Sequence, residues 1–373
     1  MKKIIQRCLL MILSLSMLFS TYSKAAENDL TAMMDSTAKS LQKCFDSKEK
    51  SILSDEQILP AGSSSSDWIA MTLAFAKSTD AYKDYLERLE DYVKAQYEKQ
   101  GYLDAVKATE YHRIALTMLA LGGNPEKLIT DQTTINLIAD GTWNFYGGFP
   151  SEQGSNGLIY ALLLLEARED FVPADKKIFK TELINELLTY QDAEGGFALN
   201  ASFGADMDMT AMAVQALAPY QNQPKVKNAT DKALLWICDR ISTAQTSEAV
   251  AQTILALCAL GIDPEKSKEF MQGERTLLEQ LNHFRTEDEM YCHELSDEAS
   301  NLVSTYQSLL ALEAVNKLRT EHTWIFDFED YTFSENLNAA KSSVIPVIIG
   351  AGASVLIAIL ILSKKRKKCL EEG

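Results

Sequence analysis

The feature that most constrains the fold is a segment rich in Ala, Leu and Met that recurs along the chain. Each copy has the apolar spacing of a helix that is hydrophobic nearly all round, as expected when a helix is packed on both sides. The copies begin near Asp67, Glu110, Asn156, Asp208, Glu248 and Asn301, at intervals of 43, 46, 52, 40 and 53 residues. A recurring helical unit of this length predicts a helical repeat protein.

A longer amphipathic segment accompanies each apolar one. Its charged residues fall on one helical face, which is typical of a helix with one side in water. These outer helices are expected at residues 29–44, 82–98, 126–139, 176–190, 227–241 and 274–284. Gly122 and Gly261 follow the last apolar turn of a helix, with a proline just beyond, which is a common way to end a helix. Paired inner and outer helices predict an all-α fold, an alpha6/alpha6 toroid of six helical hairpins, with an open helical solenoid as the alternative.

The two ends of the chain carry patterns typical of export and membrane insertion. Residues 1–25 combine a basic start, an apolar run and a small-x-small sequence ending at Ala25, which predicts a secretory signal peptide. Residues 344–362 contain no charge and precede a basic cluster, which predicts a single transmembrane helix and a basic cytoplasmic tail at 363–373. The expected organisation is therefore a toroid ectodomain at 26–333 outside the cell, a linker at 334–343 and an anchor in the cell membrane.

The charge balance limits the possible partners, and the cysteines limit the possible disulfides. The chain has 52 acidic and 36 basic residues, a net charge of -16, and an acidic body repels polyanions, so nucleic acid is not expected as a partner. Four cysteines fall in the expected ectodomain, where either free thiols or two disulfides are allowed. These are Cys44, Cys238, Cys258 and Cys292.

Residues 191–220 resemble a known family. This stretch contains QDAEGGF and then DMDMTAMAVQAL, which is similar to the repeat of protein prenyltransferase beta subunits and squalene-type terpene cyclases. The similarity covers roughly residues 66–318. The family folds as the alpha6/alpha6 toroid, which also forms the alpha domain of the vitamin B12 carriers intrinsic factor and transcobalamin. The resemblance implies the fold, but unrelated activities occur on it.

The catalytic motifs of that family are matched only in part. Class II cyclases use an Asp-x-Asp-Asp-Thr motif whose central acid protonates an alkene or epoxide. The segment DMDMT at 206–210 places Asp208 on that acid and Met209 on its acidic neighbour. Prenyltransferases hold zinc with an Asp-x-Cys pair and a later His, whereas the nearest stretch reads MYCH at 290–293. These departures favour a protein that is not an enzyme and requires no metal, with a cyclase-like enzyme using Asp208 and Asp206 as the alternative.

Candidate binding residues lie at the helix starts and in aromatic loops between hairpins. Polar residues at a helix start stabilise it as caps or against the helix dipole, and on a toroid they also converge on one mouth. Loop aromatics beside glycines can stack on a flat ligand, whereas Phe197 in the Gly-Gly-Phe turn is expected to pack between hairpins. His112 is a candidate ligand for a corrinoid cobalt. The ligand-binding candidates are Asp67, Glu110, Tyr111, His112, Trp143, Tyr146, Asn156, Asp206, Asp208, Glu248, Tyr291 and Asn301.

Together these observations predict a membrane-anchored extracellular protein of bacterial type that captures a small-molecule ligand in a polar-rimmed cavity. Resemblance to the B12 carriers implies a corrinoid or a similar bulky ligand. Because those carriers close a second domain over cobalamin, it also implies a surface partner protein or a transporter. A module that binds other proteins through its loops is a further alternative. The aromatic and acidic stretch 322–333 is expected either to close the last hairpin or to cover the toroid as a lid.

Overall fold

The computed structural model describes residues 29–45, 47, 51–131 and 133–330. Contacts divide the chain into two units, Met1–Tyr331 and Thr332–Gly373, and every described residue belongs to the first. The expected signal peptide at 1–25, linker at 334–343, transmembrane helix at 344–362 and tail at 363–373 lie outside the described residues. Within the described ranges, every helix is too short or too polar to cross a membrane.

The expected apolar helices are all present, and we call them the inner helices. They are α2 (Ser64–Phe75), α4 (Ala108–Leu121), α6 (Ser155–Leu165), α8 (Met207–Leu217), α10 (Ser247–Ala259) and α12 (Leu302–Thr320). In α10 every residue from Ser247 to Cys258 is buried, as expected for a helix packed on all sides. The expectation of an all-α fold is confirmed for the described residues, apart from two very short strands.

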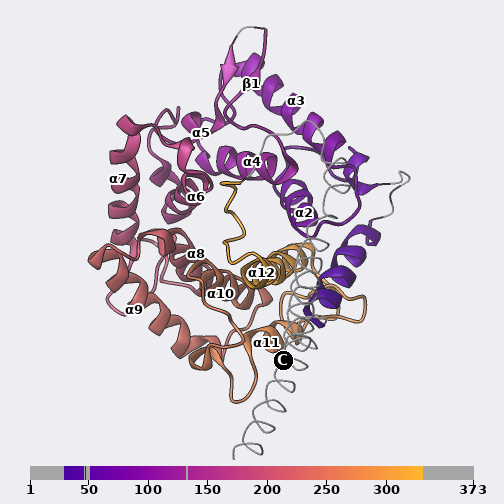
Figure 1. Ribbon diagram of the computed structural model, residues 1–373, viewed down its shortest axis with the longest axis vertical. Coiled ribbons are helices and arrows are strands. Elements are labelled where there is room, and N and C mark those ends of the chain that lie inside the picture. Colours follow the sequence, from indigo (N-terminus) through magenta and orange to yellow (C-terminus); the bar gives the residue numbers. More distant parts are fainter. Residues whose placement is uncertain (1–28, 46, 48–50, 132, 331–373) are drawn as a thin grey trace, which may run out of the picture. The chain divides into compact units, whose positions relative to one another are not determined.

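The inner helices pack against one another in chain order. Helix α2 contacts α4, and the contacts continue through α6, α8 and α10 to α12, which contacts α2 again. Figure 1 shows α3 (Tyr82–Gln100), α7 (Lys177–Leu187) and α9 (Pro224–Ile241) outside these six helices. Helix α3 buries Tyr85, Leu89 and Val93, which lie four residues apart and so share one face. The outer helices therefore cover an inner layer of six helices, in which the last helix, α12, contacts the first, α2.

The prediction of one outer helix, at residues 126–139, is wrong. Residues 126–139 mostly form a hairpin of β1 (Leu128–Ile129) and β2 (Thr134–Ile135), paired antiparallel, and the short helix α5 (Leu137–Asp140) follows. Asn136 caps α5, because its side-chain oxygen accepts from the Ala139 N–H at 3.0 Å. The β-branched Ile and Thr residues here favour extended backbone, and the Asn136 cap restarts the helix only after them. The remaining outer segments are helical, at residues 29–43 and in α3, α7, α9 and α11 (Leu277–Asn282).

The turn before α8 is built from the Gly-Gly-Phe sequence. Gly195 has φ +110°, and the backbone N–H of Phe197 donates to Thr210 Oγ1 at 2.9 Å. The backbone N–H of Asp206 donates in turn to the Phe197 carbonyl oxygen at 3.3 Å. Phe197 is fully buried, which supports the packing role expected for it.

The turn before α12 repeats this pattern with different residues. The backbone N–H of Tyr291 donates to Thr305 Oγ1 at 3.0 Å, and the N–H of Asn301 donates to the Tyr291 carbonyl oxygen at 2.7 Å. Tyr291 is fully buried and so occupies the place that Phe197 holds before α8. A shared hydrogen-bond pattern at two helix starts supports the internal repeat that the sequence predicts.

Residues 321–330 lie across the C-terminal ends of several inner helices. The rings of Phe326 and Phe328 lie 6.0 and 6.1 Å from that of Phe75, the last residue of α2. The backbone N–H of Phe328 donates to the carbonyl oxygen of Ala167, just after α6, at 2.9 Å. Figure 1 shows this segment, in yellow, amid the inner helices. Of the two expectations for this stretch, its described part supports a cover.

Candidate functional site

Two cavities lie between the inner helices and share Trp68 and Tyr160. The first, which we call the central cavity, has a volume of about 140 Å³. The second, the mouth cavity, has a volume of about 210 Å³ and is lined by residues from the first two turns of α2, α4 and α6. The central cavity is lined by Trp68, Tyr160, Asp208, Met212, Gln252, Tyr306, Gln307 and Leu310. The mouth cavity is lined by Ser64, Trp68, Thr109, Glu110, Arg113, Asn156 and Tyr160.

Three aromatic rings form walls of the central cavity. The Trp68 ring is nearly parallel to that of Tyr306, with 5° between the planes and 6.4 Å between the centroids. The Tyr160 ring lies 6.0 Å from Trp68 at 56°. Burial raises the pKa of Tyr306 to about 12 and also raises that of Tyr160, so both phenols stay protonated and neutral. These walls come from three helices that are far apart in the sequence, α2, α6 and α12.

Asp208 supplies the carboxylate of the central cavity. Its Oδ1 atom is buried and has no hydrogen-bond partner among the described residues. Burial raises the pKa of Asp208 to about 6, helped by the charges of Asp206 and Glu248 and opposed by His293. Asp208 is therefore largely ionised at neutral pH, yet one of its oxygens is unsatisfied. Such a group can receive a cation or release a proton at slightly acidic pH.

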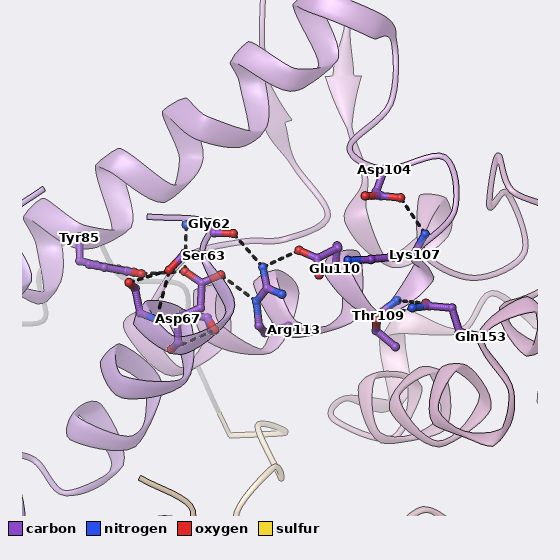
Figure 2. Close-up of polar contacts among 12 residues, drawn as sticks. Gly62, Ser63, Asp67, Tyr85, Asp104, Lys107, Thr109, Glu110, Arg113 and Gln153 are labelled. Atoms are coloured by element: carbon purple, nitrogen blue, oxygen red, sulfur yellow. Dashed lines mark hydrogen bonds and ion pairs between the residues drawn. The ribbon is translucent and has the colours of Figure 1, made fainter. Parts of the chain in front are cut away.

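Asp67 belongs to a buried network, not to an open rim. Figure 2 shows Arg113 between Asp67 and Glu110: its Nε donates to Asp67 Oδ2 at 3.0 Å and its Nη2 donates to Glu110 Oε2 at 2.8 Å. The Tyr85 hydroxyl and the Gly62 N–H both donate to Asp67 Oδ1, at 2.7 and 3.0 Å. Asp67 is completely buried, whereas Glu110 reaches the mouth cavity. The network joins α2 to α4 and fixes Arg113.

The expected caps are found at only some helix starts. Asp206 caps α8 and Asn301 caps α12, each through a side-chain oxygen that accepts from backbone N–H groups of the first turn. Ser63 and Thr246 cap α2 and α10. Helix α2 begins three residues before Asp67 and α10 one residue before Glu248, because serine and threonine just upstream satisfy free N–H groups. The acidic residues expected to cap them lie inside the first turns instead.

Glu248 is buried in α10 and links it to α12. It accepts from the Ser304 hydroxyl at 2.6 Å and from the Ser247 hydroxyl at 3.2 Å, and it lies 2.9 Å from His293 Nδ1. The hydrogen bond to Glu248 raises the pKa of His293. Glu248 lines neither cavity, and its effect on the central cavity is through its charge near Asp208.

Two of the helix-start candidates are held away from both cavities. His112 is fully buried, its Nε2 lies 2.6 Å from the Gly141 carbonyl oxygen, and burial lowers its pKa to about 4. His112 is therefore neutral and donates to that carbonyl, and it lines neither cavity. The Tyr111 hydroxyl is fixed by the backbone, since it donates to the Asp104 carbonyl oxygen at 3.0 Å.

The loop aromatics also lie outside the two cavities. Trp143 packs edge-on against Phe179, with ring centroids 6.3 Å apart. Tyr146 is 69% exposed and stacks on Tyr102 at 4.4 Å. Tyr291 is in the core, as described above. The loops therefore use their aromatic residues for packing and surface contacts.

Of the candidate residues, the structure brings Asp208 to the central cavity and Glu110 and Asn156 to the mouth cavity. The sequence predicts aromatic ligand contacts in the loops, whereas the aromatic walls of the central cavity lie on the inner helices. A signal was present: Tyr160 follows Asn156 by four residues on α6 and Tyr306 follows Asn301 by five on α12. Aromatic residues one turn inside an inner helix mark the cavity.

Metal ligands and disulfides are not found in the described part. No group of three or more His, Cys, Asp or Glu residues there is placed to hold a metal ion. The four cysteines described, Cys44, Cys238, Cys258 and Cys292, are free thiols. The chain matches no family model, no curated protein and no solved structure.

Proposed function

We propose that the chain is a membrane-anchored extracellular protein that captures a small molecule in the central cavity of an alpha6/alpha6 toroid. The contact series that runs from α2 to α12 and back supports the toroid. The sequence patterns at 1–25 and 344–362 support export and a membrane anchor.

The observation that carries this proposal is the unpartnered Oδ1 of Asp208 in a cavity with aromatic walls. Burying a carboxylate oxygen without a partner costs free energy, and such groups in folded proteins call for an explanation. A ligand that binds there supplies the missing partner. A site that is costly when empty supports a role in binding.

The cavity volume limits the ligand. A cavity of about 150 Å³ takes a guest of benzene size, and the central cavity has about 140 Å³. The ligand would therefore place one group of that size in the central cavity and extend into the mouth cavity. A corrinoid is far larger than benzene, so as a ligand it would lie across the mouth beneath a partner protein or a transporter. The geometry favours the smaller ligand.

Native mass spectrometry of the full chain in a neutral detergent tests the proposal. We expect the purified protein to carry a small molecule of constant mass, and Met212→Trp, which fills the central cavity, to lose it. Leu235→Trp is the matched control, because Leu235 is 67% exposed on α9 and the same side chain is added outside. Equal retention in Met212→Trp, or no bound molecule in the wild type, would contradict the proposal. Visible absorbance after adding cobalamin tests the corrinoid separately.

A second candidate function is acid catalysis of the terpene cyclase type. Asp208 has a pKa of about 6 and shares its cavity with three aromatic rings, whose faces stabilise a developing carbocation. The test is incubation with an unsaturated or epoxidised isoprenoid and analysis of the products. If Asp208→Asn still forms a cyclised product, Asp208 is not the acid.

A further inference from the structure

The central cavity combines aromatic rings with one carboxylate, drawn from four inner helices. Trp68 lies on α2, Tyr160 on α6, Tyr306 on α12 and Asp208 on α8. An aromatic face attracts a cation within about 6 Å of its centroid, and tryptophan does so most strongly. Because all three rings line a cavity of only about 140 Å³, a group that fills this cavity lies against each of them.

The charges around the cavity are mostly negative. Asp206 and Glu248 both act on Asp208. The cations nearby already have carboxylate partners: His293 is bonded to Glu248, and Arg113 is bonded to both Asp67 and Glu110. His293 lowers the pKa of Asp208, but burial and the charges of Asp206 and Glu248 outweigh it, and Asp208 has no ion pair among the described residues. The surrounding field therefore attracts a cation and repels an anion.

Among the described residues that line the cavity, Asp208 Oδ1 is a buried acceptor without a hydrogen-bond partner. Gln215 Nε2 donates to Gln252 Oε1 at 2.8 Å, and Gln252 Nε2 donates to Gln307 Oε1 at 2.9 Å, so the two amide oxygens that line the cavity already accept a hydrogen bond. No Lys, Arg or His lines the central cavity. An ionised carboxylate only accepts, so a carboxylate or phosphate ligand would face Asp208 without a cation to hold it.

We propose that the central cavity binds an organic cation with an alkylated ammonium group, such as the trimethylammonium group of choline. The inference rests on the proposed capture of a ligand in this cavity, and it specifies the chemical class. Such a group has about the size of the benzene guest that a cavity of about 150 Å³ accepts. It needs no hydrogen-bond acceptor beyond a nearby negative charge, and its methyl groups pack on the rings.

The test compares choline with 3,3-dimethylbutan-1-ol, which has the same shape but carbon in place of the charged nitrogen. Both are titrated into the full chain in a maltoside detergent, and heats of binding are measured. We expect choline to bind at least tenfold more tightly than the neutral alcohol. Equal affinities would overturn the cation inference while leaving ligand capture intact. If the protein carries a different co-purified molecule and does not bind choline, the cation inference is likewise overturned and ligand capture stands. If the protein neither carries a molecule nor binds choline, both proposals are overturned.

Variants locate the binding. Asp208→Asn keeps the shape of the side chain. Because Oδ1 has no partner among the described residues, the substitution removes no hydrogen bond from that atom. This variant should bind choline at least tenfold more weakly and bind the neutral alcohol with unchanged affinity. Trp68→Leu should weaken choline more than the alcohol. Asp239→Asn on the exposed face of α9 removes the same charge from the outside and should change neither affinity. An unchanged choline affinity in both cavity variants would overturn the assignment.

The same ammonium group occurs in free solutes and in lipid headgroups. Glycerophosphocholine, the soluble form of such a headgroup, distinguishes the two sources in the same titration. Binding at least as tight as that of choline indicates a lipid headgroup, because the phosphate is then accepted at the mouth. Weaker binding indicates a free solute, because at the mouth cavity Glu110 then repels the phosphate more than Arg113, which is already paired with Asp67 and Glu110, attracts it.

Discussion

Arg113 and Asp67 form a buried ion pair that joins the first two inner helices, with Arg113 Nε 3.0 Å from Asp67 Oδ2. The two side chains are 6% and 0% exposed. Replacing Arg113 with Met leaves a buried carboxylate without its cation, so we expect a loss of about 3–5 kcal/mol in the free energy of unfolding. Urea unfolding of the full chain in detergent measures this loss.

The matched control for that variant is Lys83→Met. Lys83 pairs with Glu87 at 3.7 Å on the exposed face of α3, where both side chains are more than half exposed. Exposed pairs of this kind contribute about 0–1 kcal/mol. If Arg113→Met cost no more than Lys83→Met, the buried network would not be the link between α2 and α4.

Asp208 should make the stability of the protein depend on pH. Its pKa is about 6 in the folded protein, against 3.8 for an unperturbed aspartate, so the folded state binds the proton more tightly. The ionised carboxylate therefore lowers the free energy of unfolding. This destabilisation is absent below about pH 4 and reaches its full value above about pH 6. Asp208→Asn should therefore be more stable than the wild type at pH 7.5 by about 1–2 kcal/mol, after allowing for partial solvent screening.

Thermal unfolding at pH 7.5 and pH 4 measures that difference, which should largely vanish at the lower pH. Asp206, Glu248 and His293 act on the same carboxyl, and all three remain in the variant. Asp239→Asn, on the outer surface, should show no such pH-dependent gain. An Asp208→Asn protein less stable than the wild type at pH 7.5 would show that the carboxylate has a partner.

The turn before α8 should not tolerate a side chain at Gly195. Its φ is +110°, and a Cβ atom there would lie 2.6 Å from the carbonyl oxygen of Lys232. Backbone strain and overpacking each cost about 1–3 kcal/mol, so Gly195→Ala should lose at least about 2 kcal/mol of unfolding free energy. Gly204→Ala, where nothing lies within 4 Å, should change it by less than about 0.5 kcal/mol. Similar small effects at both positions would contradict the described turn.

Residues 321–330 should contribute to stability through Phe326. This side chain is 3% exposed, and its ring contacts Phe75 and Trp324. Phe326→Ala should cost about 3–5 kcal/mol, as for other buried phenylalanines. Phe203→Ala is the control, since Phe203 is 61% exposed. Equal unfolding midpoints for the two variants would show that the segment does not pack on the inner helices.

The inner helices could be predicted from the sequence because their signal is local. An apolar run with helical spacing, a glycine stop at Gly122 and a polar first turn all lie within one segment. The β1–β2 hairpin was missed because a short stretch with both Ile and charged residues fits a helix as well as a hairpin. The β-branched residues and the Asn136 cap decide between the two.

The candidate site was predicted less well because it depends on contacts between distant segments. Trp68 and Tyr306 meet only because α12 packs against α2. No local pattern reports that contact. Asp208 was identified from its motif, but its lack of a hydrogen-bond partner depends on the neighbouring helices. His112 shows the opposite error: a polar residue near a helix start turned inward to the Gly141 carbonyl.

The most direct test of the ligand site is the position of a bound cation in a crystal. Tetramethylarsonium has the shape and charge of tetramethylammonium, and its arsenic atom can be located by anomalous scattering. Crystals of the protein soaked in this ion should show an arsenic peak in the central cavity, against the lining residues Trp68, Tyr160, Tyr306 and Asp208. Arsenic peaks only elsewhere, with the central cavity empty, would contradict the account.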